Sequence, residues 1–350
     1  MASGKKILKV LDTLTLMAQN SIESLDAESE TPKNEIKSII ESKNVLAVGI
    51  SEKISKKKKT GKLALIFYVE KKIAINKLKK SQLIPKTIPR SLTGGSAVQT
   101  DVIAIGKLQP EINSSRTSFQ PGNSIGHIKI EAGTFGAVVK DKKNKLYILS
   151  NCHVLANSGK GKIGDKILYP GAFDTGVSPA DAKATLHKFI PFKISKEFTN
   201  VVDCALAAPL NEFLPSLKSE IKSWGLPKGV IKPKRGMKVV KVGRTTGKTT
   251  SVITDVNFRT MMDYKKKGLK DIRFKDQIWC EKRYTMPGDS GSLIIDKASG
   301  KAVGLHFAGA EGGSAHNPIT EVLAALDVKL VTSTLSKKKP VTKTKSAKRK

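Results

Sequence analysis

Short apolar runs separated by turn residues dominate the chain from residue 119 to residue 310. Examples are KLYILSN, VVDCALAAPL, KVVKVG and GSLIIDK, which are divided by segments rich in Gly, Pro and Asn. Short strands at such close intervals are typical of all-β sandwiches and barrels. Helical spacing returns only at 319–330, where Ile319, Val322 and Leu326 share one face. The pattern therefore predicts a mainly β region that is closed by a terminal helix.

The preceding part of the chain has a different pattern. Apolar positions at helical spacing in residues 5–18 predict an amphipathic helix. Its polar face is not basic enough for a membrane anchor, so we expect it to lie on the body of the protein. The polar segment 24–34 is typical of a linker. Residues 34–108 predict a helix, two strands around the Lys-rich turn 56–59, a short helix at INKLKKSQL and a further strand, which together form a small α+β domain.

The charge of the chain is unusually high. Its 63 Lys and Arg residues outnumber its 30 Asp and Glu residues and give a formal net charge of +33. A field of this sign attracts nucleic acid, anionic membrane surfaces or acidic polypeptides, and it does not specify the fold. Part of the excess lies in 336–350, which is almost devoid of apolar residues and is expected to be a disordered tail. This tail either binds nucleic acid or anionic surfaces weakly and nonspecifically, or only aids solubility.

Cysteine spacing and hydropathy restrict the compartment and the cofactors. Cys152, Cys204 and Cys280 are widely spaced and form no CxxC pair, which favours neither a disulfide framework nor a zinc site. The first residues lack the apolar core and the cleavage site of a signal peptide. No stretch approaches the roughly 18 apolar residues that span a membrane. These features predict a cytoplasmic protein with no transmembrane segment, no metal and no cofactor.

Three residues in separate blocks have contexts that suit nucleophilic catalysis. His153 follows an apolar strand in YILSNCHVLAN, Asp203 lies in the apolar run NVVDCALAAPL, and Ser290 lies in the glycine-flanked turn PGDSGSLI. A lone carboxylate in an apolar run needs a partner, because burial of an unpaired charge is costly. The chain order His, Asp, Ser is the order of chymotrypsin-type proteases, and it differs from the orders of subtilisins and α/β-hydrolases.

These blocks carry a resemblance to a known family. SNCHVL, VVDCALA and PGDSGSLI resemble the catalytic blocks of trypsin-like serine peptidases. Further blocks, such as PGNSIGHIKIEAGTFGAVV and VGLHFAG, resemble intracellular members from bacteria and plants that have an extra N-terminal domain. The resemblance covers about residues 116–330 closely and 44–108 loosely. It implies a chymotrypsin-like double β-barrel, a protein or peptide substrate, and serine endopeptidase activity.

The expected organisation follows from the pattern and the resemblance together. We expect a mainly β protein in four parts: an N-terminal helix and linker (1–33), a small α+β domain (34–110), a trypsin-like peptidase domain (116–332) and a basic tail (333–350). The α+β domain either regulates the peptidase domain, with a regulatory protein as a partner, or only stabilises it. No catalytic constellation is visible in the α+β domain itself.

The expected chemistry uses the three blocks in distinct roles. His153 would take the proton of Ser290 and return it to the leaving amine, while Asp203 holds the imidazole tautomer. The backbone N–H groups of Gly288 and Ser290 would form the oxyanion hole. In this motif Asp289 usually locks the loop through a buried charge contact. Cys152 and Cys204 are expected to pack behind the site as small apolar groups.

The residue that precedes the cut is expected to be read by Thr285 and His306. Tyr284 stands where trypsins have the Asp that selects Lys and Arg, so trypsin specificity is not expected. A Thr and a His at such positions resemble glutamyl endopeptidases and viral proteases that cut after Gln. Both side chains donate hydrogen bonds to a carboxylate or amide oxygen, which predicts a preference for Glu or Gln. The alternative is a His306 packed in the barrel beside a pocket for small apolar residues.

Other interpretations remain open. A catalytically silent, protease-like scaffold could bind a protein partner or nucleic acid through its basic surface. A phosphate-binding loop at KVGRTTGKTTS is rejected, because only three residues separate Gly243 from Gly247 and a strand follows. His127, expected early in a strand, and His187 and His316, expected in loops, have no metal-ligand spacing and are assigned structural or solvent-facing roles.

Overall fold

The computed structural model describes most of the chain from residue 42 onward and parts of the region before it. The described residues are 4, 7–8, 10–12, 39–40, 42–55, 58–79, 82–88, 90, 97–107, 118–264 and 268–335. The predicted linker 24–34 and the predicted tail 336–350 lie outside these residues, as does most of the predicted helix 5–18. The protein is mainly β, as the short apolar runs predict.

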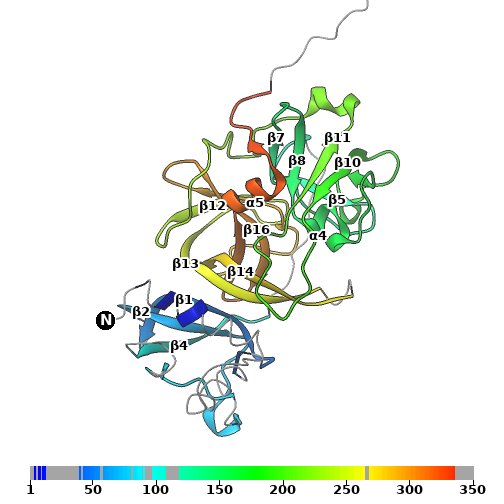
Figure 1. Ribbon diagram of the computed structural model, residues 1–350. Helices are drawn as coiled ribbons and strands as arrows, with labels where there is room; N and C mark the ends of the chain where they lie inside the picture. The colour runs from blue at the N-terminus through cyan, green and yellow to red at the C-terminus, as the bar shows by residue number, and fades with distance from the viewer. Residues whose placement is uncertain are drawn as a thin grey trace, which may run out of the picture.

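An antiparallel sheet of eight strands forms the first half of the main body (Figure 1). Its order is β18-β7-β8-β11-β10-β9-β5-β6. The bounds are β5 Ser124–His127, β6 Gly133–Thr134, β7 Ala137–Lys140, β8 Leu146–Ser150, β9 Lys166–Leu168, β10 Ala182–Phe189, β11 Ala205–Pro209 and β18 Lys329–Leu330. His127 therefore ends β5, and His187 belongs to β10 rather than to a loop.

A closed ring of six strands forms the second half. The order β12-β15-β16-β17-β14-β13 is completed by pairing of β12 with β13, so these strands surround a core. The bounds are β12 Lys238–Gly243, β13 Gly247–Tyr264, β14 Leu269–Glu281, β15 Leu293–Asp296, β16 Ala302–Ala310 and β17 Gly313–Pro318. His316 lies in β17, so its expected place in a loop is wrong. We call these six strands the barrel ring.

The predicted terminal helix is confirmed as α5 (Ile319–Leu326), although it is shorter than the predicted 319–330, because Lys329–Leu330 form the strand β18. Its apolar face belongs to a core cluster that also contains Leu149 and Leu206 of the first sheet and Val240 and Ile295 of the barrel ring. The helix therefore seals the junction of the two halves. This position explains why Ile319, Val322 and Leu326 recur on one face.

Four further strands, here called the N-terminal strands, extend the ten-stranded sheet beyond the barrel ring (Figure 1). Their bounds are β1 Val45–Ser55, β2 Lys58–Val69, β3 Thr87–Ile88 and β4 Val98–Ala104. β1 and β2 form the predicted hairpin, and β4 runs parallel to β2. Within the short helix expected at INKLKKSQL, the described regular element is a 3-10 turn at Ile75–Lys77.

Both faces of the N-terminal strands are covered. One face packs on Ile7, Leu11 and Ile39 from the segments that precede β1. The other face packs on aromatic residues of β13 and β14, among them Phe258 and Trp279. Burial on both sides accounts for the continuous apolar run LALIFYV in β2, which does not alternate as a half-exposed strand would.

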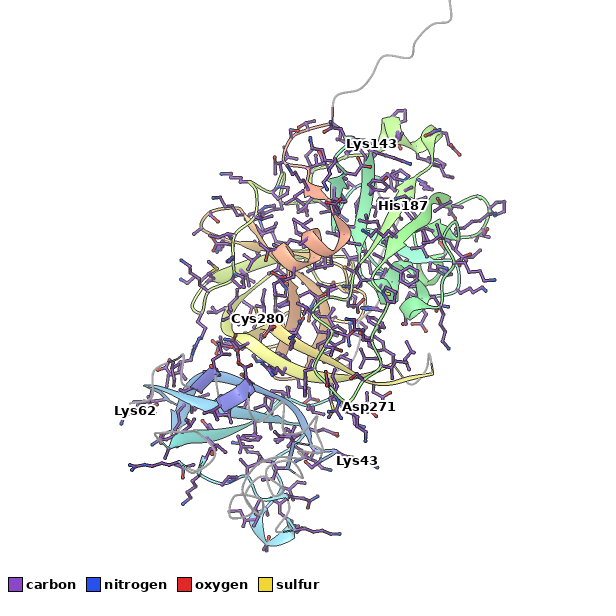
Figure 2. The ribbon with its side chains drawn as sticks, in the orientation of Figure 1. Lys43, Lys62, Lys143, His187, Asp271 and Cys280 are labelled. Atoms are coloured by element: carbon purple, nitrogen blue, oxygen red, sulfur yellow. The ribbon has the colours of Figure 1, made fainter. Side chains whose placement is uncertain are left out.

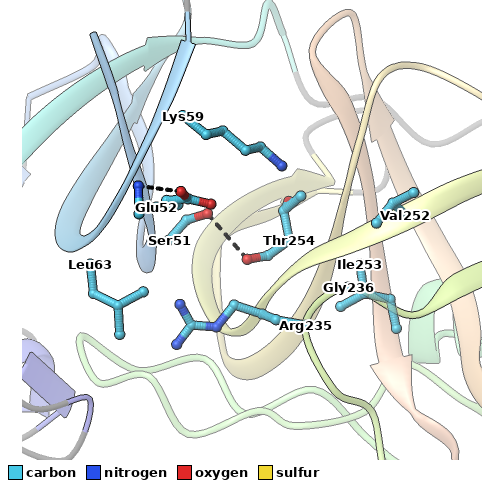
Figure 3. Close-up of a pocket in the computed structure, with 10 residues that line it drawn as sticks. Ser51, Glu52, Lys59, Leu63, Arg235, Gly236, Val252, Ile253 and Thr254 are labelled. Carbon is cyan, nitrogen blue, oxygen red and sulfur yellow. Dashed lines mark hydrogen bonds between the residues drawn. The ribbon is translucent and has the colours of Figure 1, made fainter.

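The N-terminal strands join the barrel ring through a shared strand edge. β1 pairs antiparallel with β13, with Ala47 opposite Thr260 and Val48 opposite Arg259. The Ser51 hydroxyl donates to the carbonyl of Thr254 over 3.1 Å. A cavity of about 420 Å³ opens beside this contact, between the β1–β2 hairpin, β13 and the segment before β12, and the Arg235 side chain projects across it (Figure 3).

A carboxylate is buried at the same junction. Asp255 of β13 is fully buried, and its Oδ1 accepts the N–H of Asn257 over 2.7 Å. Its Oδ2 has no hydrogen-bond partner among the described residues. A Cβ atom at Gly49 of β1 would lie 2.0 Å from this oxygen, so only glycine allows β1 to pass here. Burial raises the pKa of Asp255 to about 7, against opposing contributions from backbone N–H groups and Arg235.

Positive charge is distributed widely over the described surface. The labelled side chains Lys43 and Lys62 lie at the N-terminal strands and Lys143 lies at the opposite end of the molecule (Figure 2). No helix among the described residues is long and apolar enough to cross a membrane. In the same part of the chain, no group of three or more His, Cys, Asp or Glu residues is placed to hold a metal ion.

Candidate functional site

His153 lies on a single helical turn, α4 (Cys152–Leu155), that follows the end of β8. Its ring Nδ1 lies 2.5 Å from Oδ2 of Asp203, and its backbone N–H donates to Oδ1 of the same carboxylate over 3.1 Å. Both residues are buried. Because one carboxylate holds both the ring and the backbone of His153, the orientation of the imidazole is fixed.

Asp203 is itself held from several sides just before β11. Its N–H donates to Oδ1 of Asn317 over 2.9 Å, and its carbonyl accepts the side-chain amide of Asn151 over 2.7 Å. Its Oδ2 also accepts the hydroxyl of Tyr264 over 3.0 Å. The sequence predicts that an Asp in an apolar run has partners, and the structure shows them. The Asp203 carboxylate accepts hydrogen bonds from His153 and Tyr264.

Ser290 lies in the turn before β15, against the first sheet. Its carbonyl accepts the N–H of Thr134 over 2.7 Å. A Cβ at Gly133 would lie 3.0 Å from this carbonyl oxygen and 2.5 Å from a methyl of Val154, so glycine lets the Ser290 turn and the His153 helix approach β6 together. The structure thus brings the three predicted blocks to one place between the two halves.

The second ring nitrogen of His153 is available for chemistry. Its Nε2 is buried and has no hydrogen-bond partner among the described residues. The Ser290 hydroxyl is therefore not hydrogen-bonded to it in this structure. Hydrogen bonds between a nucleophile and its base are often long without substrate and tighten when the substrate binds.

The backbone of the Gly288–Ser290 turn has the form expected of an anion pocket. Gly288 has φ +99°, a region that favours glycine, and its carbonyl accepts the Thr134 hydroxyl over 2.6 Å. The N–H of Gly288 donates to no acceptor in the described part of the chain. A donor fixed in a turn and left open is what an oxyanion requires.

A buried ion pair holds this turn from below. The Lys241 Nζ of β12 lies 2.7 Å from Oδ2 of Asp289, and both side chains are fully buried. Oδ1 accepts the N–H groups of Thr245 and Thr246 over 3.0 and 3.2 Å. Burial alone would raise the pKa of Asp289, but the Lys241 ammonium and these neighbouring donors lower it below its usual range. The positive charge that pairs with Asp289 therefore comes from a lysine side chain and not from an N-terminal amine.

Lys241 was missed by the sequence analysis, although a signal exists. In KVVKVG it is a lysine among apolar residues that become the wall of the barrel ring, and such a lysine needs a buried acid. Gly243 two residues later has a related reason. A Cβ there would lie 2.2 Å from Oδ1 of Asp289, so the glycine makes room for the ion pair and not for a phosphate.

Two cysteines lie behind the pair of His153 and Asp203. Cys152 and Cys204 are buried free thiols, as expected. Burial, reinforced by the Asp203 carboxylate, raises the pKa of each thiol well above its usual value. Because a thiolate is the nucleophilic form, both residues act here as small apolar groups.

The predicted specificity residues both contact β17, next to the Ser290 turn. Thr285 is buried, with its hydroxyl 2.6 Å from the Ser314 hydroxyl. His306 of β16 is buried, its Nδ1 is 3.2 Å from the Ala315 carbonyl, and its own carbonyl accepts the Gly291 N–H over 2.8 Å. The backbone of His306 is thus tied to the residue that follows Ser290.

His306 also belongs to a buried polar chain that the sequence did not reveal. Its Nδ1 lies 3.2 Å from Nδ1 of His316, and the Nε2 of His316 lies 2.9 Å from the Tyr284 hydroxyl. Burial, together with the neighbouring His306, lowers the pKa of His316 well below its usual value. His316 is therefore neutral and joins Tyr284 to His306 as a hydrogen-bonding group.

Comparison with known proteins finds structural likeness only. No family model matches the chain, and no curated protein matches it. Among solved structures, a glutamic-acid-specific serine protease described as using a histidine triad in substrate binding is 17% identical, covers 61% of this chain and all of its own, and has a TM-score of 0.43. An α-lytic protease homologue is 17% identical with the same coverages and a TM-score of 0.45.

A third solved structure gives a similar result. Protease A of Thermobifida fusca is 15% identical, covers 62% of this chain and all of its own, and has a TM-score of 0.42. The likeness is to chymotrypsin-like serine proteases and extends over the larger part of the chain.

Proposed function

We propose that this protein is a serine endopeptidase with Ser290 as nucleophile, His153 as general base and acid, and Asp203 as the residue that orients the base. The observation that carries the proposal is the buried contact of 2.5 Å between His153 Nδ1 and Asp203 Oδ2, with the opposite ring nitrogen left open. This is the arrangement in which a neutral imidazole accepts a proton on Nε2 while a carboxylate stabilises the cation that forms.

The reaction then proceeds in two halves. The Ser290 hydroxyl attacks the peptide carbonyl, its proton passes to Nε2 of His153, and the same proton is given to the leaving amine. In the second half, His153 takes a proton from a water molecule as this water attacks the acyl-enzyme, and then returns the proton to the Ser290 oxygen. The N–H groups of Gly288 and Ser290 stabilise the oxyanion in both halves, and the Lys241–Asp289 pair keeps their turn in position.

Covalent labelling tests the proposal. A fluorophosphonate probe is expected to label the wild-type protein on Ser290, and the label is expected to disappear in Ser290→Ala. Ser216→Ala, which alters an exposed serine on the first half of the body, is the matched control and should label normally. A wild-type protein that is folded yet never labelled would support the silent, protease-like scaffold instead.

We further propose a preference for Glu or Gln at the residue before the cut. Thr285 contacts Ser314 of β17, and His306 contacts the next residue of that strand, Ala315, so both lie near the Ser290 turn. Each of these two side chains carries a hydrogen-bond donor. In the tautomer in which the Tyr284 hydroxyl donates to Nε2 of His316 and the Nδ1–H of His316 donates to Nδ1 of His306, the ring of His306 is fixed and its proton lies on Nε2. A fixed imidazole N–H selects a side-chain oxygen and disfavours ligands that leave it unpaired.

Peptide-library profiling measures this preference. Wild-type protein is expected to cut after Glu or Gln, and His306→Leu is expected to lower kcat/KM for these substrates by roughly 10- to 100-fold, the worth of one hydrogen bond to a charged group. His187→Leu removes a histidine from the distant eight-stranded sheet (Figure 2) and should leave the profile unchanged. Cleavage chiefly after Leu, Ala or Lys would contradict the proposal.

A further inference from the structure

Tyr264 connects the proposed catalytic carboxylate to a distant part of the fold. It is the last residue of β13, and its hydroxyl donates to the same oxygen of Asp203 that faces His153. Its ring is buried and stacks on Phe192 with centroids 5.2 Å apart. Burial, reinforced by the Asp203 carboxylate, raises the pKa of Tyr264 well above its usual value, so the hydroxyl keeps its proton and acts as a donor.

The segment that carries Tyr264 extends beyond the barrel ring. β12 pairs with β13 only along residues 247–252, and β17 pairs with β14 only along 278–281. The outer part of the hairpin, residues 258–264 and 269–277, continues past both neighbours. We call this part the outer hairpin. An isolated two-stranded ribbon is marginally stable in water and needs a third strand or an apolar cover.

The N-terminal strands provide a third strand and an apolar cover on the β13 side, while on the β14 side Asn200 bridges Phe274 and its carbonyl accepts the N–H of Lys275 over 2.9 Å. β1 takes the free edge of β13 at Arg259 and Thr260, and the Thr260 hydroxyl donates to the carbonyl of Leu46 over 2.8 Å. Arg259 is also ion-paired with Asp12 of the preceding segment. Tyr264 itself belongs to the core cluster that contains Ala47, Ile66 and Tyr68 of β1 and β2. Packing is therefore continuous from the N-terminal strands to Asp203.

We propose that the N-terminal strands are an intramolecular activator: docked on β13, they fix the outer hairpin so that Tyr264 holds Asp203, and through it His153, in the productive orientation. This inference rests on the proposed function. Tyr264 acts through Asp203 and is a positioning residue. The N-terminal strands then promote activity in the assembled chain and do not restrain it.

The first test removes the hydroxyl alone in the full chain. Tyr264→Phe is expected to lower kcat by roughly 10- to 100-fold with little change in KM, because a hydrogen bond to a charged group is lost. The Asp203 carboxylate, having lost a donor, stabilises the imidazolium more strongly, so the acidic limb of the pH profile of kcat/KM should move to higher pH. Tyr147→Phe, which removes a hydroxyl from another Tyr–Asp contact on β8, should change neither quantity.

The second test asks whether docking acts through Tyr264. Ala47→Glu places a charge in the buried face of β1 and should increase hydrogen exchange at the Thr260 amide. If that exchange is unchanged, Ile66→Asp places a charge in the same core cluster and serves as the second docking variant. Either docking variant should lower kcat in the wild-type background. Combined with Tyr264→Phe, it should cause little further loss, because both changes interrupt one connection.

The outcomes separate this inference from the proposed function. NMR titration of the His153 ring needs no turnover, and Tyr264→Phe should shift it to higher pH even in a protein with Ser290→Ala. A wild-type protein that neither labels nor cleaves would refute the proposed function. Additive losses in the double variant, or an unchanged His153 titration in Tyr264→Phe, would refute the role of Tyr264 and of the N-terminal strands.

Discussion

Replacement of Lys241 by methionine is expected to remove most of the proposed activity and much of the stability. The methionine fills a similar volume but leaves the Asp289 carboxylate buried without a cation. Loss of one partner of a buried pair costs about 3–5 kcal/mol. Asp289 then either takes up a proton or moves towards water, and the second response displaces the Gly288 and Ser290 N–H groups. Loss of one oxyanion donor lowers kcat by roughly 10²–10³-fold.

The measurement combines urea unfolding with steady-state kinetics. Lys238→Met, at the exposed end of the same strand, is the matched control and should change both by little. The double variant Lys241→Met with Asp289→Asn should recover much of the stability, because no buried charge remains, without recovering kcat. Near-normal stability and turnover in Lys241→Met would contradict the role given to the ion pair.

Asp255 is expected to contribute stability that falls as the pH rises from about 4 to about 7, whereas His316, whose pKa is lowered by burial, contributes in the opposite direction. The pKa of Asp255 is raised to about 7 in the folded protein, from an ordinary value of 3.8. Between these values the folded protein keeps a proton that the unfolded chain has released, so the stabilisation is complete below about pH 4 and is lost by about pH 7. A shift of this size corresponds to on the order of 4 kcal/mol.

Asp255→Asn should remove this component, because an amide resembles the neutral acid and does not titrate. The free energy of unfolding of Asp255→Asn relative to that of the wild type should therefore rise between pH 5 and pH 8, because the contribution of His316 is common to both proteins. The Arg235 side chain before β12 acts on this carboxylate, and burial raises the pKa of the nearby Tyr68 of β2 well above its usual value, so Tyr68 keeps its proton in that range. Asp263→Asn, an exposed change on β13, is the control. A stability difference between Asp255→Asn and the wild type that stays constant from pH 5 to pH 8 would exclude this assignment.

The sequence allowed much of the site to be predicted, because each block carries its own local signal. His153, Asp203 and Ser290 stand in contexts of strand end, apolar run and glycine turn, and the structure brings them together. Tyr264 had no such signal. It meets Asp203 across 61 residues, only because an unusually long hairpin passes the barrel ring. Contacts of this kind depend on strand register, which local patterns do not specify.

The errors have physical reasons as well. The sequence predicts a loop around His316, yet this residue lies inside the short buried strand β17, which begins at Gly313 and ends at Pro318. The division into 1–33, 34–110, 116–332 and 333–350 stays a prediction. The change in the apolar pattern at residue 119 indicates a boundary in the chain, but it gives no sign that β1 shares a strand edge with β13.

The pairing of β1 with β13 has a consequence for solubility. An open strand edge offers a row of unpaired N–H and C=O groups to any extended chain. Without residues 1–110, the edge of β13 near Arg259 and Thr260 would lose its partner strand, and the apolar side chains of Phe258 and Trp279 would lose their cover. A shortened chain would then expose an unpaired strand edge and an apolar surface to a second copy of itself. We therefore expect it to self-associate before the barrel ring unfolds.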